Sequence, residues 1–270
     1  MPLNEIPGVD VLEVVSVGQP LRSGHNRPID MYCQFDEFSS PQNYVVKLYD
    51  DLPLKRHTCA RELLGSLLAI AFDLKTPKPA VINLSTDICQ TVMNLDLSGR
   101  IRRSIGYNFG SKRVEKEAMI FTNASDNELQ EAADVFAFDA LTQNPDRRIG
   151  NPNMFKTSDG FILFDHEMAF PFSRPRDLLG GFPEAWELNL KGKGDFLTNH
   201  AVYRFIKGQP VIFEDYTEKL ASMSQDVISA LVSKLPDEWM SDEIENIIGY
   251  LSRARDHANL VKRCLQEVLA

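Results

Sequence analysis

The chain has 270 residues, 43% of them hydrophobic and 25% charged, with a formal net charge of −9 at pH 7. This length and composition are those of an ordinary soluble protein with one domain or one two-lobed unit and a sizeable core. The negative charge argues against a general affinity for nucleic acid.

Cysteine and histidine spacing gives no sign of disulfides or of structural zinc. The four cysteines stand far apart without a Cys-x-x-Cys pair, and the five histidines show no metal-ligand spacing. The N-terminal segment lacks the charged start and apolar core of a signal peptide, and no run approaches the ~18 apolar residues of a membrane span. We therefore expect a cytoplasmic protein without membrane segments.

Two strands are predicted near the N-terminus. Residues 11–17 are rich in β-branched side chains, and residues 29–35 alternate between apolar and polar. The turn-rich stretch 18–28 between them has backbone amides and a hydroxyl that can cover phosphate groups. A plain hairpin loop is the alternative interpretation, because glycine patterns of this kind have low specificity.

A lysine in the next predicted strand has an unusual place. Lys47 lies in the strand 44–49 with apolar residues on both sides, where an ammonium group needs an anion. The segment 54–73 has leucines at helical spacing and carries Glu62, the best candidate partner, while Glu37 is a less favoured one. The alternative is that Lys47 protects an edge strand and that Glu62 is a solvated helix residue.

Two further strands are predicted near 80–84 and 88–95, after prolines that end the helix. We expect the second strand to lead into a hinge, so that residues 1–96 form an N-lobe and residues 97–270 a C-lobe. The stretch 99–116 carries six basic residues without a clear period. Such a run is typical of a solvated surface, and binding of an anionic acceptor or partner is the alternative.

The middle of the chain is predicted to hold a helix and then a hairpin. Ser125 and Glu128 form a capping-box pattern at the start of a helix that runs to about Thr142. Residues 154–156 and 160–164 are predicted as two strands joined by a tight turn. This arrangement brings the loop before the hairpin close to the residues that follow it.

Three oxygen-bearing side chains lie on those two segments. Asp146 is followed by four residues and then Asn151, and Asp165 comes directly after the apolar run 161–164. In phosphoryl transfer one aspartate accepts the proton of the acceptor hydroxyl, while an asparagine of the same loop and a second aspartate bind magnesium. Magnesium is a hard cation that prefers such oxygen ligands. The pattern therefore predicts a kinase active site.

The chain after residue 171 is predicted to be mostly helical. Short helices are expected in the segments 184–190, 194–206, 212–223 and 225–235. Ser241 is a candidate cap for the last and longest helix, whose apolar stripe runs to Val268 at 3.6-residue spacing.

Taken together, these motifs resemble those of the HipA-like kinases and, more distantly, those of the type II phosphatidylinositol 4-kinases. The matching features are Lys47 in a strand, Glu62 in the next helix, Asn-Pro-Asp-Arg at 144–147 with Asn151, and Asp-His-Glu-Met-Ala-Phe at 165–170. The chain looks like a short member, without the extra N-terminal subdomain of the longer toxin kinases.

The resemblance implies an α+β, two-lobed protein-kinase-like fold, with a small β-rich N-lobe containing one helix and a larger, mostly helical C-lobe. It implies ATP and Mg²⁺ as cofactors, a serine or threonine of a protein as the most favoured acceptor, and an antitoxin-like regulator as a further partner. By the motif match Asp146 is the base, Asn151 and Asp165 are metal ligands, and Lys47 with Glu62 clamps the phosphates.

The phosphate-covering loop is expected to contribute Arg22, Ser23, Gly24 and His25. By similarity to the longer toxin kinases, Ser23 is a candidate to accept a phosphate itself. Two positions depart from the family pattern: Pro145 stands where threonine is more usual, and Glu167 stands where glycine is often found. Glu167 adds a third carboxylate beside the expected metal site.

Two other functions are alternatives to a protein kinase. The lipid-kinase likeness suggests a lipid or small-molecule acceptor, although the sequence shows no amphipathic anchor. A pseudokinase that only binds a partner is the second alternative, and the complete set of catalytic residues speaks against it.

Overall fold

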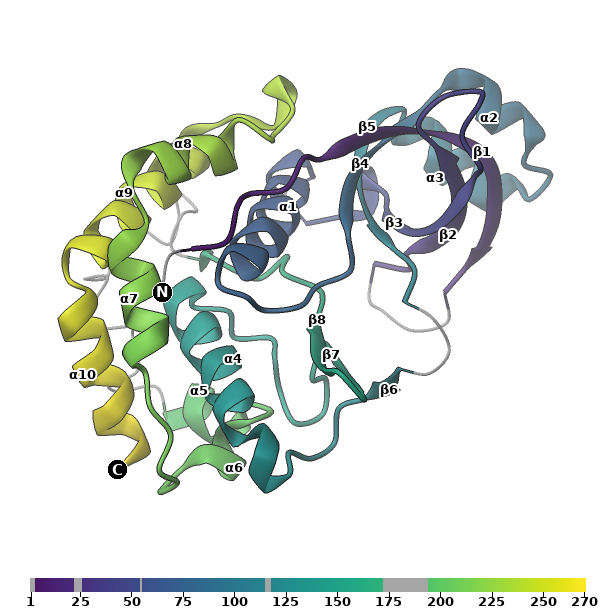
Figure 1. Ribbon diagram of the computed structural model, residues 1–270. Helices are drawn as coiled ribbons and strands as arrows, with labels where there is room; N and C mark the ends of the chain where they lie inside the picture. Colours follow the sequence, from purple (N-terminus) through teal and green to yellow (C-terminus); the bar gives the residue numbers. More distant parts are fainter. Residues whose placement is uncertain (1–2, 22–25, 54, 115–117, 172–193) are drawn as a thin grey trace.

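The computed structural model of the chain describes residues 3–21, 26–53, 55–114, 118–171 and 194–270. Within these residues a strand-rich N-terminal portion is followed by a helical C-terminal portion, and Figure 1 shows the two side by side. This mixed layout confirms the predicted division into a strand-rich first part and a helical second part.

The N-terminal portion contains a closed barrel with the strand order β1-β2-β3-β5-β4. Its strands are β1 (Asp10–Pro20), β2 (Ile29–Gln34), β3 (Gln42–Lys47), β4 (Pro79–Leu84) and β5 (Gly106–Lys112). Neighbouring strands are antiparallel except β1 and β4, which pair in parallel and close the ring. In β2 the alternate side chains Ile29, Met31 and Cys33 are buried in the barrel core, as the period of two predicts.

The prediction of a strand at 88–95 is wrong. Helix α2 (Thr86–Thr91) and the start of helix α3 (Leu95–Arg103) occupy this segment. Asn94 caps α3 by accepting a hydrogen bond from the backbone N–H of Leu97 at 3.0 Å. Such a cap stabilises a helix by about 1 kcal/mol, which favours the helix over a short extended segment.

The lobe boundary predicted at residue 96 falls inside the strand-rich portion. The strand that completes the barrel, β5, lies beyond that boundary and pairs with both β3 and β4. Because α1, α2 and α3 all precede β5, the expectation of one helix in the strand-rich portion is wrong. The sequence could not reveal this, because β5 meets its partners only when the barrel closes.

The basic stretch 99–116 is not irregular, since most of it forms the end of α3 and all of β5. Arg100 is buried and donates hydrogen bonds to the Asp51 carboxylate at 2.9 Å and to the carbonyl oxygen of Arg27 at 2.7 Å. A buried arginine with these partners holds α3 against the barrel. The interpretation of the whole stretch as a solvated surface is therefore wrong at Arg100.

The predicted helix and hairpin in the middle of the chain are confirmed. Ser125 and Glu128 make the expected capping box at the helix start. The elements here are α4 (Leu129–Thr142), β6 (Met119–Ile120), β7 (Met154–Thr157) and β8 (Gly160–Leu163). β7 and β8 form the hairpin, and β6 extends it to a three-stranded sheet.

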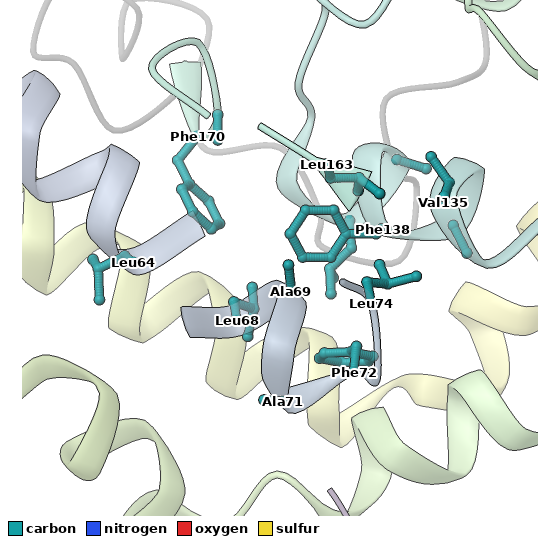
Figure 2. Packing of buried hydrophobic residues seen from close by; sticks show 14 of the residues in the cluster. Leu64, Leu68, Ala69, Ala71, Phe72, Leu74, Val135, Phe138, Leu163 and Phe170 are labelled. Carbon is teal, nitrogen blue, oxygen red and sulfur yellow. The ribbon is translucent and has the colours of Figure 1, made fainter. Parts of the chain in front are cut away.

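Helix α1 (Arg56–Ala71) lies between the barrel and the C-terminal portion (Figure 1). It is buried on almost every side, and its buried residues include the charged Arg61 and Glu62 as well as leucines and alanines. Figure 2 shows Leu68 and Ala69 of α1 beside Phe138 of α4 and Leu163 of β8. Each fully buried leucine or phenylalanine contributes about 1.5 to 3 kcal/mol, so this packing fixes α1 against the hairpin.

The C-terminal portion is helical, as predicted. Its helices are α5 (Gly194–Asn199), α6 (Tyr203–Ile206), α7 (Glu214–Ser222), α8 (Gln225–Val232), α9 (Asp242–Asp256) and α10 (Ala258–Leu269). The last long helix is in fact α9 and α10, because His257 leaves helical geometry with φ −120° and ψ 27°. The break lets both helices pack against α7. The helix predicted at 184–190 lies outside the described residues, and the one at 194–206 is interrupted near His200.

No helix in the part of the chain that the structure describes is long and apolar enough to cross a membrane. No disulfide joins any two of the four cysteines, and Cys33, Cys59 and Cys89 are buried.

Candidate active site

A cleft of about 710 Å³ is lined by residues of the barrel, of α1 and of the segments around the β7–β8 hairpin. The predicted site residues Lys47, Glu62, Asp146, Asn151 and Asp165 all line it. They come from β3, from α1, from the loop after α4 and from the segment after β8. The structure therefore brings together side chains that are more than 100 positions apart in the sequence.

Lys47 is the last residue of β3, and its ammonium group meets three carboxylates. Its Nζ forms ion pairs with Glu62, with Asp165 Oδ1 at 2.7 Å and with Glu167 Oε2 at 3.1 Å. Burial alone would lower the pKa of Lys47, but the three carboxylates raise it well above its ordinary value. The amine is therefore held in its charged form.

The alternative interpretation of Lys47 as an edge-strand lysine is excluded by the barrel. β3 pairs with β2 on one side and with β5 on the other, so its backbone is not an exposed edge. The rival partner Glu37 is exposed in the turn between β2 and β3, whereas Glu62 contacts the ammonium directly.

Glu62 is buried on α1 and links that helix to the segment after β8. Its Oε2 accepts a hydrogen bond from the backbone N–H of His166 at 2.8 Å. Burial, only partly offset by Lys47, raises the pKa of Glu62 to about 7. A Cβ at Gly65, almost one turn further along α1, would lie 2.5 Å from the Cβ of His166. Glycine at this position thus permits the close approach of the two segments.

Asp165 leaves β8 in a left-handed backbone conformation with φ 63°, which is uncommon for a residue other than glycine. Burial would raise the pKa of Asp165, but the charge and the hydrogen bond of Lys47 lower it below its ordinary value. Oxygen atoms of Asp165, Glu62 and Glu167 lie within 4.8 Å of one another. The segment after β8 therefore presents two carboxylates to the lysine.

Both carboxylate oxygens of Asp146 accept hydrogen bonds. Oδ1 accepts from Arg148 Nη2 at 2.7 Å, and Oδ2 accepts from Asn153 Nδ2 at 2.9 Å and from Asn151 Nδ2 at 3.2 Å. Asn153 was not predicted, although it lies closer to Asp146 than Asn151 does. The one feature of the sequence that could have indicated a role for Asn153 is the Asn-Pro-Asn run. Asn153 has a left-handed backbone with φ 45°, which asparagine adopts more readily than most residues.

A buried polar cluster holds this loop on α4, and sequence reasoning missed it. Arg147 Nε donates to Asp139 Oδ2 at 2.6 Å, and Arg147 Nη1 donates to the carbonyl oxygen of Asn153. His200 Nε2 lies 3.0 Å from the same oxygen of Asp139, while its Nδ1 accepts from the N–H of Val202 at 3.3 Å. This pattern of acceptor and donor places the ring proton on Nε2. Asp139 thereby fixes both the loop and the segment before α6.

The donor set of the cleft fits a magnesium ion. Asp165 supplies a carboxylate, and Asn151 uses its amide nitrogen toward Asp146, which leaves its carbonyl oxygen as a possible ligand. The predicted phosphate-loop residues Arg22, Ser23, Gly24 and His25 lie outside the described residues. The next residue, Asn26, lines the cleft and donates from Nδ2 to Glu167 Oε2 at 2.7 Å.

Comparison with protein families matches residues 14–176 to the model described as HipA-like kinase. This range is more than half of the chain and includes the five predicted residues that line the cleft. Comparison with curated proteins gives no match.

Proposed function

The chain belongs to the HipA-like kinases, and from this premise we propose that it uses ATP and Mg²⁺ to phosphorylate a serine or threonine hydroxyl of a protein. The observation that carries the proposal is the cleft itself. Lys47 and Glu62 reach it from the strand-rich portion, and Asp146, Asn151 and Asp165 reach it from the segments around the β7–β8 hairpin. This is the set of groups that phosphoryl transfer requires.

Each residue has a role that its contacts support. Magnesium-bound ATP supplies the phosphoryl group and an electrophilic centre whose charge the metal partly neutralises. Lys47, kept charged by the carboxylates around it, holds phosphate oxygens. Asp165 and Asn151 offer oxygen ligands to the metal, and Asp146 accepts the proton of the acceptor hydroxyl.

The layout also supports a kinase-like fold with two lobes. We place the division after β5 and not at residue 96, because β5 is part of the barrel. α1 then belongs to the first lobe and carries Glu62 to its partner on β3.

The family likeness favours a protein acceptor and a role as a toxin-like regulator that an antitoxin-like partner controls. Acceptor surfaces are built from variable loops, so the fold alone does not select the acceptor. The experiment therefore has to identify the acceptor.

The proposal is tested by incubating the purified protein with Mg²⁺ and labelled ATP, alone and with a cell lysate, and by locating new phosphosites by mass spectrometry. The matched control is Asp146→Asn, checked for folding by circular dichroism and for MgATP affinity by calorimetry. We expect transfer by the wild type, a loss of about 100-fold or more in the variant, and similar MgATP affinity for both. Folded wild-type protein that labels neither itself nor any lysate protein would refute the proposal. Transfer to lipid vesicles or to a metabolite instead would establish the alternative acceptor class.

A further inference from the structure

The ammonium group of Lys47 has its three N–H donors directed to three carboxylates. Glu62, Asp165 and Glu167 each accept one contact from Nζ. An ammonium group has three donors in total, so these contacts use all of them. A phosphate oxygen that binds Lys47 must therefore replace one of the three carboxylates.

The same three carboxylates are close enough together to hold a metal ion, but Lys47 already occupies their centre. A magnesium ion bound by all three would lie about 2.1 Å from each oxygen. Lys47 Nζ is itself only 2.7 Å from Asp165 Oδ1 and 3.1 Å from Glu167 Oε2. Two cations in that space would repel each other strongly at low effective dielectric. Glu62, Asp165 and Glu167 therefore act together as counter-ions of Lys47.

Glu167 is the carboxylate with the weakest anchorage. Glu62 is buried, and its second oxygen is bound to the backbone N–H of His166. Asp165 is held by its closer contact to Lys47. The hydrogen bonds described for Glu167 run to Lys47 and to Asn26, at the end of the β1–β2 connection. The Glu167 side chain can therefore move away from Lys47 without breaking a hydrogen bond to α1.

We propose that Glu167 is a resident anion at the phosphate-binding face of Lys47 and that it sets the affinity of the cleft for nucleotide. The inference rests on the proposed function for the identity of the ligand. A phosphate oxygen takes the place of the Glu167 carboxylate, and the carboxylate moves away together with its link to Asn26. Glu167 thereby acts against nucleotide binding, the opposite of what a metal ligand would do.

The test compares wild type with Glu167→Gln, which keeps the shape and the acceptor for Asn26 but removes the charge. Glu37→Gln is the matched control, because it removes one exposed negative charge in the turn between β2 and β3. Calorimetry measures the binding of three probes: ATP in the presence of EDTA, MgATP and inorganic tripolyphosphate. We expect Glu167→Gln to bind all three about tenfold more tightly, the order expected from removing one part-buried like charge, and Glu37→Gln to match the wild type.

The outcomes separate this inference from the proposed function. Unchanged binding in Glu167→Gln overturns the inference, and weaker binding of MgATP with unchanged binding of ATP in EDTA makes Glu167 a metal ligand instead. If no variant binds ATP, the proposed function fails. Tighter binding of tripolyphosphate by Glu167→Gln would then still support the displacement of Glu167 by phosphate.

Discussion

Arg147 and Asp139 form an ion pair that is fully shielded from solvent, with Arg147 Nε 2.6 Å from Asp139 Oδ2. Arg147 directly follows the proposed base Asp146, and Asp139 lies on α4, so the pair anchors the loop to the helix. A second link comes from the segment before α6, where the backbone N–H of Ala201 donates to the carbonyl oxygen of Arg147 at 3.0 Å. The position of Asp146 thus depends on residues that do not line the cleft.

We predict that Asp139→Asn destabilises the protein strongly. The substitution leaves the Arg147 guanidinium buried without a counter-ion, which costs about 3 to 5 kcal/mol. Urea denaturation of the variant and the wild type measures the change. Glu238→Gln is the control, because its ion pair with Arg56 is about 40% exposed and its loss costs under about 1 kcal/mol. Similar small effects for both variants would contradict the anchoring role of Asp139.

His200 is predicted to act as a positioning residue. His200→Ala removes the donor to Asp139, and we expect kcat to fall by about tenfold or more because the loop that carries Asp146 loses support. The KM for ATP should change much less, since Lys47 and Asp165 are untouched. Steady-state kinetics well below the unfolding temperature separates the two parameters.

Rescue by a conservative variant distinguishes positioning from general damage. His200→Gln can still donate to Asp139 and should keep most of the wild-type kcat. His257→Ala is the control, because this histidine contacts the carbonyl oxygen of Arg253 between α9 and α10. An equal loss of kcat in the His257 variant, or no loss in His200→Ala, would argue against a specific role for His200.

Gly65→Ala is predicted to destabilise the protein although alanine is the better helix former. Alanine favours a helix interior by about 1 kcal/mol over glycine, but the new Cβ would lie 2.5 Å from the Cβ of His166. The segment with Asp165 must then move away from α1, so MgATP affinity should fall as well. Thermal unfolding and calorimetry measure the two effects.

Gly249→Ala in α9 is the matched control for that substitution. The nearest atom to its new Cβ is Arg253 Nη1 at 3.4 Å, at the end of a flexible side chain. This variant should gain up to about 1 kcal/mol in unfolding free energy. If Gly65→Ala were stabilising to the same extent, the close approach of α1 and the segment after β8 would be wrong.

Asp134 on α4 is predicted to make stability depend on pH. Burial raises the pKa of Asp134 from 3.8 to about 6. The folded state binds this proton more tightly than the unfolded state. The contribution of protonated Asp134 to stability is therefore lost as pH rises from 3.8 to about 6. Above about pH 6, the partly buried charge of Asp134 costs stability.

Asp134→Asn should therefore stabilise the protein by about 1 to 3 kcal/mol at about pH 8 and have little effect at about pH 4. Asparagine keeps an oxygen that can accept from Gln130 Nε2, which lies 3.2 Å from Asp134 Oδ1. Urea denaturation at both pH values measures the difference. A stabilisation that does not vary with pH would show that the charge of Asp134 is not its cause.

The sequence determined the features that depend on nearby residues. The capping box of Ser125 and Glu128, the β7–β8 hairpin and the alternation in β2 each follow from interactions within a few positions. The order of Asp146, Asn151 and Asp165 also predicted which side chains line the cleft, because their spacing along one loop and one hairpin is a local property.

The tertiary structure alone decided the features that depend on distant residues. Barrel closure by β5 and the contact of His200 with Asp139 arise where segments far apart in the chain meet. The contact of Glu167 with Lys47 is of the same kind. An ion pair or a hydrogen bond acts over a few ångströms of space, so its partner can be any residue that the packing of the core brings within reach.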